Sequence, residues 1–161
     1  FEGKHMIEDV NNQIYNLSKK FEKEIHLIEK LSLVDDILPH IKTIIGNFNF
    51  SECEMLITSC SYSKSKKVIS ELEEYTEKLS FSLNIKKKLF HFVGNENKVL
   101  EQLDRYKVKK IIVHPVFFFN GFLYKKNTEI FSKSFKTLKL LPLSHYDEII
   151  EAISLKLLRN F

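Results

Sequence analysis

The stretch IIVHPVFFFNGF, residues 111–122, decides the fold. It begins as a short apolar run and ends in a Phe-x-Gly turn at residues 119–121, which leads into a helical pattern. Strands of parallel α/β proteins are buried on both faces, so they read as continuous apolar runs followed by helices. The stretch therefore predicts a parallel strand over residues 110–118 and a helix after it.

The same alternation extends outward along the chain. Further apolar runs of strand length lie at 24–29, 54–58, 89–93 and 137–141. Apolar residues spaced by three and four predict helices over 7–21, 37–45, 68–79, 99–103 and 149–157. For the second helix we expect Asp35 or Asp36 as the N-cap, with Pro39 in the first turn, where its missing N–H costs little. Together these elements predict an α/β fold of the flavodoxin-like kind, with a mainly parallel sheet and helices on both faces.

A weak internal repeat is the second informative feature. FEG at residues 1–3 precedes a helix, a strand and LSLVDDIL (31–38), and FNG at 119–121 precedes a helix, a strand and LSHYDEII (143–150). The glycines are 118 residues apart and the leucines 112, so the copies differ by a six-residue deletion. The repeat predicts two pseudo-repeated lobes, with residues 1–48 ending the first and residues 49–161 forming the second.

The repeat also predicts what surrounds the first copy. Two strand–helix units and a third strand precede FNG, so we expect equivalent strands of the first lobe upstream of Phe1. We therefore expect an unpaired sheet edge or apolar surface near residues 1–45, and self-association through it.

Composition excludes several classes of protein. The 161 residues carry a net charge of only +4, and no aromatic ladder accompanies the basic runs, which argues against nucleic-acid binding. Cys53 and Cys60 form no C-x-x-C pair, which favours a reducing compartment. No apolar run approaches the ~18 residues of a membrane span. The single alanine and the abundance of Lys, Asn, Ile and Phe suggest an AT-rich genome, and hence the plastid stroma or a bacterial cytoplasm.

Two segments carry a resemblance to a known family. FEGKHMIED (residues 1–9) resembles a turn of the CbiX-type sirohydrochlorin chelatases, in which an apolar strand end is followed by Gly-x-His-x-x-x-Asp. Residues 111–123 resemble a second-half strand of the long, duplicated members, with Val116 where a tyrosine is usual, and residues 143–158 resemble their closing helix. The resemblance implies a chelatase fold and a lyase that inserts cobalt or iron into sirohydrochlorin, in siroheme or cobalamin biosynthesis. It implies no permanently bound cofactor, because the divalent metal is a substrate.

The resemblance also assigns site residues. It gives His5 the role of holding or delivering the metal, and it places four residues in the tetrapyrrole pocket: Phe1, Glu2, Gly3 and Lys4. An imidazole at a strand-to-helix turn can bind a divalent metal and accept a proton, although it can equally be a solvent-exposed residue at a helix start. The counterpart of His5 in the second copy is Leu123, so we expect that copy to be a scaffold half.

The remaining candidates are expected to be structural. His114 lies within a strand and should be packed or hydrogen-bonded, whereas His145 should be a cap or surface residue. Other residues lack a partner at metal-ligand spacing or an activating neighbour, namely His26, His40, His91, Cys60, Tyr62 and Tyr146. We expect Cys60 to face the cleft, and the two tyrosines to serve in packing.

Two alternatives to a chelatase remain open on the sequence. One is a flavodoxin-like binding module without enzymatic activity, in which the Phe-x-Gly turns are only tight connections. The other is an inactive chelatase remnant that pairs with another chain.

Overall fold

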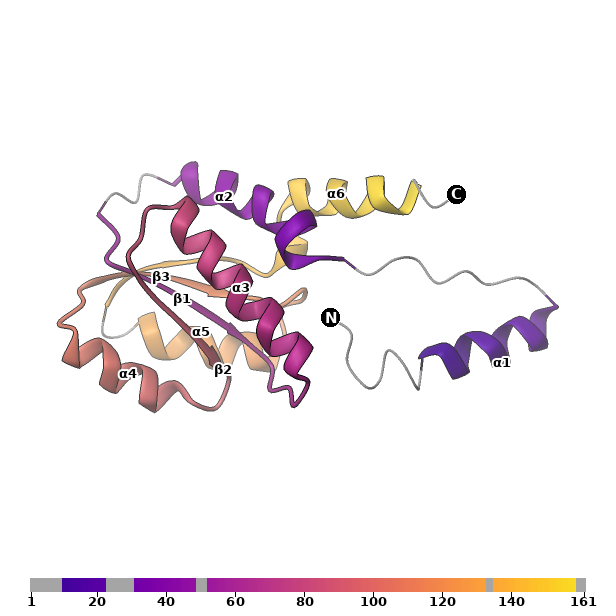
Figure 1. Ribbon diagram of the computed structural model, residues 1–161, viewed down its shortest axis with the longest axis horizontal. Coiled ribbons are helices and arrows are strands. Elements are labelled where there is room, and N and C mark those ends of the chain that lie inside the picture. Colours follow the sequence, from indigo (N-terminus) through magenta and orange to yellow (C-terminus); the bar gives the residue numbers. More distant parts are fainter. Residues whose placement is uncertain (1–9, 23–30, 49–51, 133–134, 159–161) are drawn as a thin grey trace.

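A computed structural model of the chain describes residues 10–22, 31–48, 52–132 and 135–158 (Figure 1). Its elements in chain order are α1 (Asn11–Phe21), η2 (Leu33–Ile37), α2 (Leu38–Gly46), β1 (Met55–Cys60), α3 (Lys66–Ser82), β2 (Lys87–Phe92), α4 (Glu96–Arg105), β3 (Lys110–Pro115), α5 (Phe122–Ser132), β4 (Lys136–Lys139), η3 (Leu143–His145) and α6 (Asp147–Leu158). All sequence-predicted site residues, His5, Phe1, Glu2, Gly3 and Lys4, lie outside the described residues, as does the strand expected at 24–29.

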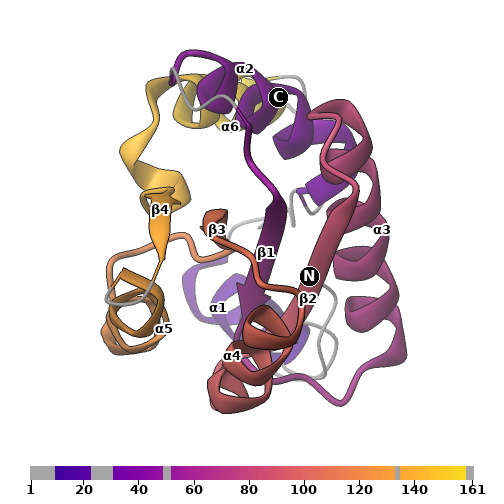
Figure 2. The same cartoon turned by 90° about the vertical axis from the view of Figure 1, so that its left-hand side faces the viewer.

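The described strands form one parallel sheet in the order β2-β1-β3-β4, which Figure 2 shows across its width. In the register, Ile57 of β1 pairs with Leu89 of β2 and with Val113 of β3. The predicted α/β class and the predicted parallel pairing of these four runs are confirmed. The order matches the first four strands of the flavodoxin arrangement.

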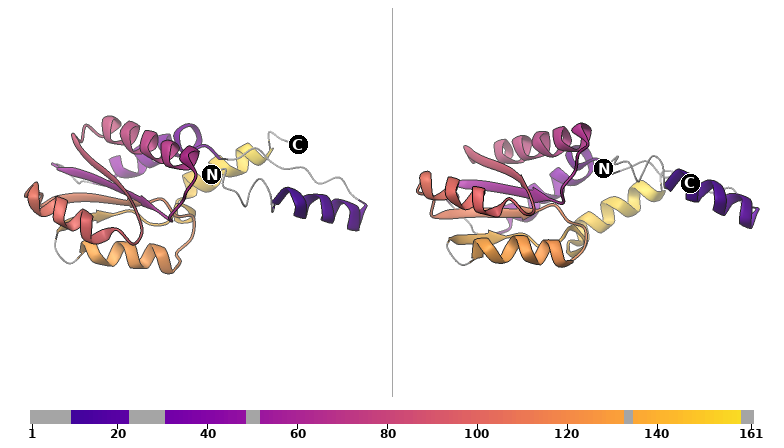
Figure 3. Two further views of the ribbon diagram at one scale, coloured as in Figure 1. Left: turned by 60° about the horizontal axis from the view of Figure 1, so that its bottom comes forward. Right: turned by 90° about the horizontal axis from the view of Figure 1, so that it is seen from below.

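Helices cover both faces of the sheet. Helix α3 lies on one face, whereas α4 and α5 lie on the other (Figure 3). Strand β1 is buried along its whole length, and its side chains alternate between the two cores: Leu56 points to the α3 side and Ile57 to the α4–α5 side. The α3-side core also contains residues of η2, α2 and α6.

The start of α2 differs from the prediction. Neither Asp35 nor Asp36 is the N-cap: a π-helical turn, η2, begins at Leu33, and the Ser32 side chain caps it by accepting a hydrogen bond from the Asp35 N–H at 3.1 Å. The Asp36 carboxylate accepts one from the Ser32 N–H at 2.7 Å. The spacing of apolar residues predicts where the helix lies. It does not show that the Ser32 side chain, rather than that of Asp35 or Asp36, accepts the hydrogen bond from an unpaired N–H group of the first turn.

Strand β3 is shorter than the 110–118 run, because the chain turns at its carboxyl end. Val116 N–H still donates to the Ser59 carbonyl at 2.7 Å, but Phe117 N–H donates back to the Pro115 carbonyl at 2.9 Å, in a three-residue turn. The apolar residues after Pro115 therefore form a loop at the end of the strand.

The buried centre of the sheet gives a test of the fold. Leu56 in β1 is fully buried, so Leu56→Ala should lower the free energy of unfolding by about 2–5 kcal/mol through the cavity it leaves. Phe81→Ala is the matched control, because Phe81 is 86% exposed and should change the value by no more than about 0.5 kcal/mol. Urea unfolding followed by circular dichroism measures both, and equal effects would contradict the assigned core.

Candidate functional site

The candidate site lies at the carboxyl edge of the sheet, between β1 and β3. The chain leaves β1 for α3 on one face and leaves β3 for α5 on the other. Adjacent parallel strands whose connections diverge in this way form a topological switch point, and the crevice above it is where open α/β sheets bind ligands. The loops that border it are residues 61–65 after β1 and residues 116–121 after β3.

The two repeat motifs of the second copy meet at this edge. Leu143 N–H donates to the Phe117 carbonyl at 2.9 Å, and Ser144 N–H donates to the Phe118 carbonyl at 3.0 Å. The LSHYDEII segment therefore braces the loop that carries the Phe-x-Gly turn. Gly121 in that turn does not adopt a positive φ, and a Cβ built on it would meet no atom within 4 Å. Gly121 therefore leaves open space at this turn and does not supply an unusual backbone conformation.

Aromatic side chains lie on these loops or beside them, and we call them the edge aromatics: Tyr62, Phe92, Phe118, Phe119 and Phe122. Tyr62 meets Phe92 edge to face at a centroid distance of 5.3 Å, and Phe118 meets Phe119 at 4.8 Å. Tyr62, Phe119 and Phe122 are nevertheless 66%, 71% and 78% exposed. These rings offer a flat apolar surface at the carboxyl edge, while Phe48, Phe81 and Tyr106 are exposed toward the opposite edge.

Exposed lysines border the same loops. Lys64 lies in the loop after β1, and Lys125 and Lys126 lie near the start of α5. The edge therefore combines flat apolar rings with positive charge, which suits a planar ligand that carries carboxylates.

A buried polar cluster supports this edge on the α4–α5 side. Ser59 Oγ donates to Asn127 Oδ1 at 2.6 Å, and Asn127 Nδ2 lies 3.4 Å from His91 Nε2. His91 Nδ1 lies 3.0 Å from the Phe92 carbonyl, so the imidazole donates there and accepts from Asn127. Burial lowers the pKa of His91, which keeps the ring neutral as this arrangement requires.

Glu96 completes the cluster at the start of α4. Its Oε1 accepts from the Gly94 N–H at 2.7 Å. Although burial acts to raise the pKa of Glu96, this backbone hydrogen bond and the neighbouring His91 and Asn127 hold it below its ordinary value. The cluster ties the ends of β1 and β2 to α4 and α5. We did not predict it, although polar residues inside two apolar strand runs were a signal for it.

The α3 side has its own buried polar pair. His114 Nε2 and Tyr75 Oη are 2.8 Å apart, and both side chains are fully buried. His114 Nδ1 has no hydrogen-bond partner in the described part of the chain. Burial lowers the pKa of His114 to about 3. The prediction that His114 is packed and hydrogen-bonded is confirmed.

The prediction that Cys60 faces the cleft is wrong. Cys60 is 4% exposed and lies in the α3-side core, because strand alternation places it on the same face as Thr58. Burial raises the pKa of its thiol to about 12, so it is not an activated nucleophile.

His145 is exposed, as predicted, and the Tyr146 hydroxyl accepts from the Leu141 N–H at 2.8 Å. Leu123, the counterpart of His5, is 40% exposed at the start of α5.

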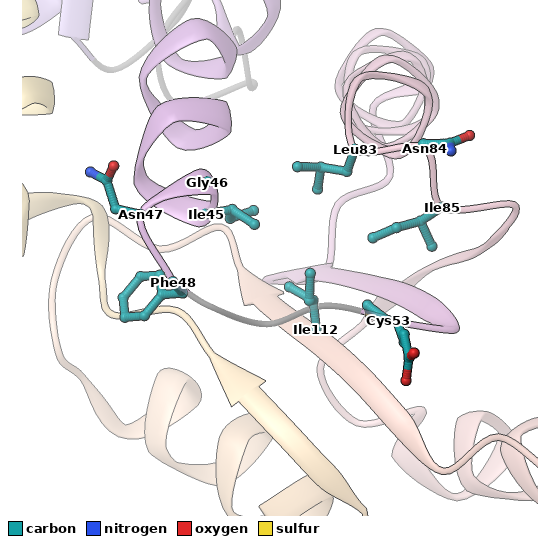
Figure 4. A pocket seen from close by; sticks show the side chains of 10 residues that line it. Ile45, Gly46, Asn47, Phe48, Cys53, Leu83, Asn84, Ile85 and Ile112 are labelled. Atoms are coloured by element: carbon teal, nitrogen blue, oxygen red, sulfur yellow. The ribbon is translucent and has the colours of Figure 1, made fainter.

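A separate pocket of about 720 Å³ lies at the opposite, amino-terminal edge (Figure 4). Its walls include Phe48 after α2, Cys53 before β1 and Ile85 before β2. Because the loops from strands to helices gather at the other edge, we assign the site there and not to this pocket.

Two further features concern the described ranges of the chain. No group of three or more His, Cys, Asp or Glu side chains is arranged to hold a metal ion there. Over the same ranges, no helix is long and apolar enough to cross a bilayer.

Comparisons with protein-family models, with curated proteins and with solved structures found no match to this chain.

The buried His114 predicts a specific dependence of stability on pH. Its pKa is about 3 in the folded chain and ~6.5 when unfolded, so the unfolded state takes up the proton first. The free energy of unfolding should fall as the pH drops below ~6.5, by about 2–3 kcal/mol from this group between pH 7 and pH 4.5.

The test compares urea unfolding at those two pH values in the parent and in His114→Phe. The variant should lose less stability on acidification by about that amount. His145→Phe should behave like the parent, because its imidazole is exposed. Equal pH dependence in His114→Phe and the parent would contradict the assignment.

Proposed function

We propose that this chain acts on sirohydrochlorin as a metal chelatase of the kind its sequence resembles. The observation that carries the proposal is the set of edge aromatics at the β1–β3 switch point, bordered by Lys64, Lys125 and Lys126. A tetrapyrrole is a flat ring system with an apolar face and many carboxylates. Aromatic rings can stack on its face while lysines pair with its carboxylates.

Metal insertion removes two pyrrole N–H protons and places one divalent cation between the ring nitrogens. A neutral imidazole can hold the incoming ion weakly and can also accept a proton. The resemblance gives that role to His5, and the repeat relates the turn of His5 to the turn that carries Phe119. In this proposal the first copy presents the metal and the second copy supplies a surface for the macrocycle.

A non-enzymatic binding module is the second candidate, and one observation favours it. Within the described residues, His91 and His114 are buried in the interior with neutral rings. The exposed His145 belongs to no group of three ligating side chains that could hold a metal ion there. The same edge aromatics would then bind a planar ligand without metal chemistry. The two candidates differ in whether the chain inserts metal into the bound ligand at all.

The first test concerns His5. In the full-length polypeptide, His5→Ala should lower the rate of cobalt or iron insertion into sirohydrochlorin by about tenfold or more, because a positioned acid–base group contributes ~10²–10⁴-fold. His145→Ala is the matched control and should leave the rate unchanged. The absorbance change on metal uptake measures both rates. Equal, measurable rates for the parent and His5→Ala would refute the role of His5, whereas no metal insertion by the parent would leave the binding module as the function.

The second test concerns the edge aromatics. The double change Phe119→Ala and Phe122→Ala should weaken sirohydrochlorin binding by about tenfold, since each exposed ring loses a stacking contact. Phe81→Ala serves as the control, because Phe81 is equally exposed but lies at the end of α3, away from this edge. Titration of metal-free sirohydrochlorin, followed by its fluorescence, measures the affinity. Unchanged affinity in the double variant would refute the assigned surface.

A further inference from the structure

Helix α1 carries an apolar stripe that no other described part of the chain covers. Val10, Ile14, Leu17 and Phe21 recur at spacings of four, three and four, so they share one face of the helix. Leu17 and Phe21 are 43% and 57% exposed, and α1 lies apart from the sheet and its helices (Figure 1). An isolated helix of this length is marginal in water, so this stripe needs a partner surface.

Helix α6 has an apolar face on each of two sides. On its inner side Ile149 is fully buried in the α3-side core, and Lys156 pairs with Asp36 at 2.7 Å. Its outer stripe consists of Ile150, Leu157 and Leu158, which are 39%, 38% and 71% exposed. A helix that is apolar around most of its circumference is ordinarily buried on more than one side.

The two stripes match in length and in charge. Helix α1 has 11 residues and α6 has 12, so each is about 17 Å long. Lys20 flanks the α1 stripe in the last turn, whereas Asp147 and Glu151 flank the α6 stripe at its start. An antiparallel pairing therefore brings Lys20 beside the two acids while the apolar residues face one another.

We propose that α1 of one copy packs antiparallel on the outer stripe of α6 in a second copy, and that the second copy reciprocates. In the single chain α1 and α6 lie apart, although both extend from the same end of the sheet (Figures 1 and 3). A two-fold axis between copies makes both contacts at once, which doubles the apolar area buried. The inference rests on the exposed faces and the charges alone, and it does not depend on the proposed function.

The first measurement is the molar mass of the full chain in solution by light scattering at tens of micromolar. The parent should be a dimer, and Leu17→Glu and Leu157→Glu should each give a monomer, because a carboxylate in the paired stripes would be desolvated. Phe81→Glu should remain dimeric, since that exposed ring lies at the end of α3. Circular dichroism checks that each variant is folded. A monomeric parent, or a dimer that survives both stripe variants, would overturn the proposal.

Charge-reversal variants distinguish contacts of α1 with α6 of a second copy from contacts of the two helices within one chain. Lys20→Glu alone and Glu151→Lys alone should each weaken the dimer by about fivefold at low salt, because like charges then face each other. An equimolar mixture of the two variants should restore it, since in the heterodimer both helix pairs carry opposite charges at these positions. A mixture as weak as its components would overturn the proposal, because pairing within a chain cannot be rescued by mixing.

Discussion

The pairing of β1 with β3 is the constraint on which the rest of the structure depends. These two strands lie at the centre of the sheet, and every residue of β1 is buried. Because the connections from them diverge to opposite faces, their pairing fixes which helices cover which side. It also creates the crevice at the carboxyl edge where the site is assigned. A slip of one residue between β1 and β3 would exchange the two cores and expose the polar residues of β1 to the wrong helices.

Because these strands lie at the centre of the sheet, the polar side chains near their ends are buried and need hydrogen-bond partners. Thr58 bonds to Thr76 of α3 at 2.5 Å, whereas Ser59, its neighbour in β1, bonds to Asn127 of α5. A buried polar atom without a partner costs more than a hydrogen bond contributes, so each must meet its complement on the correct face. His91 meets this demand through both ring nitrogens, whereas His114 bonds Tyr75 through Nε2 and its Nδ1 has no partner within the described residues. Burial lowers the pKa of both imidazoles. These interactions join the sheet to α3 and α5 beneath the loops of the carboxyl edge.

The sequence was sufficient for the class of fold and for the order of its elements, because apolar periodicity reflects burial directly. Sequence-based prediction failed where a local structure depends on which of several nearby groups makes a contact in the folded chain. Ser32 rather than an aspartate caps η2, and the apolar run after Pro115 leaves the sheet as a loop. The cluster of Ser59, His91 and Asn127 joins residues up to 68 positions apart, and no local pattern encodes such a contact. The edge aromatics could not be recognised either, since an exposed phenylalanine and a core phenylalanine read alike in sequence.

The position of α2 in the core can be compared with its position in the sequence repeat. By sequence, residues 31–38 belong to the first copy, yet η2 and α2 fill the same core as β1, β3 and α3 of the second. The helix that follows the first LS motif in the sequence thus completes the core that β1, β3 and α3 form. The corresponding helix of the second copy, α6, contacts η2 through its inner side and keeps an apolar stripe on its outer side. Residues on both sides of the predicted division after residue 48 therefore contribute to the α3-side core, because η2 and α2 pack there together with β1, β3 and α3.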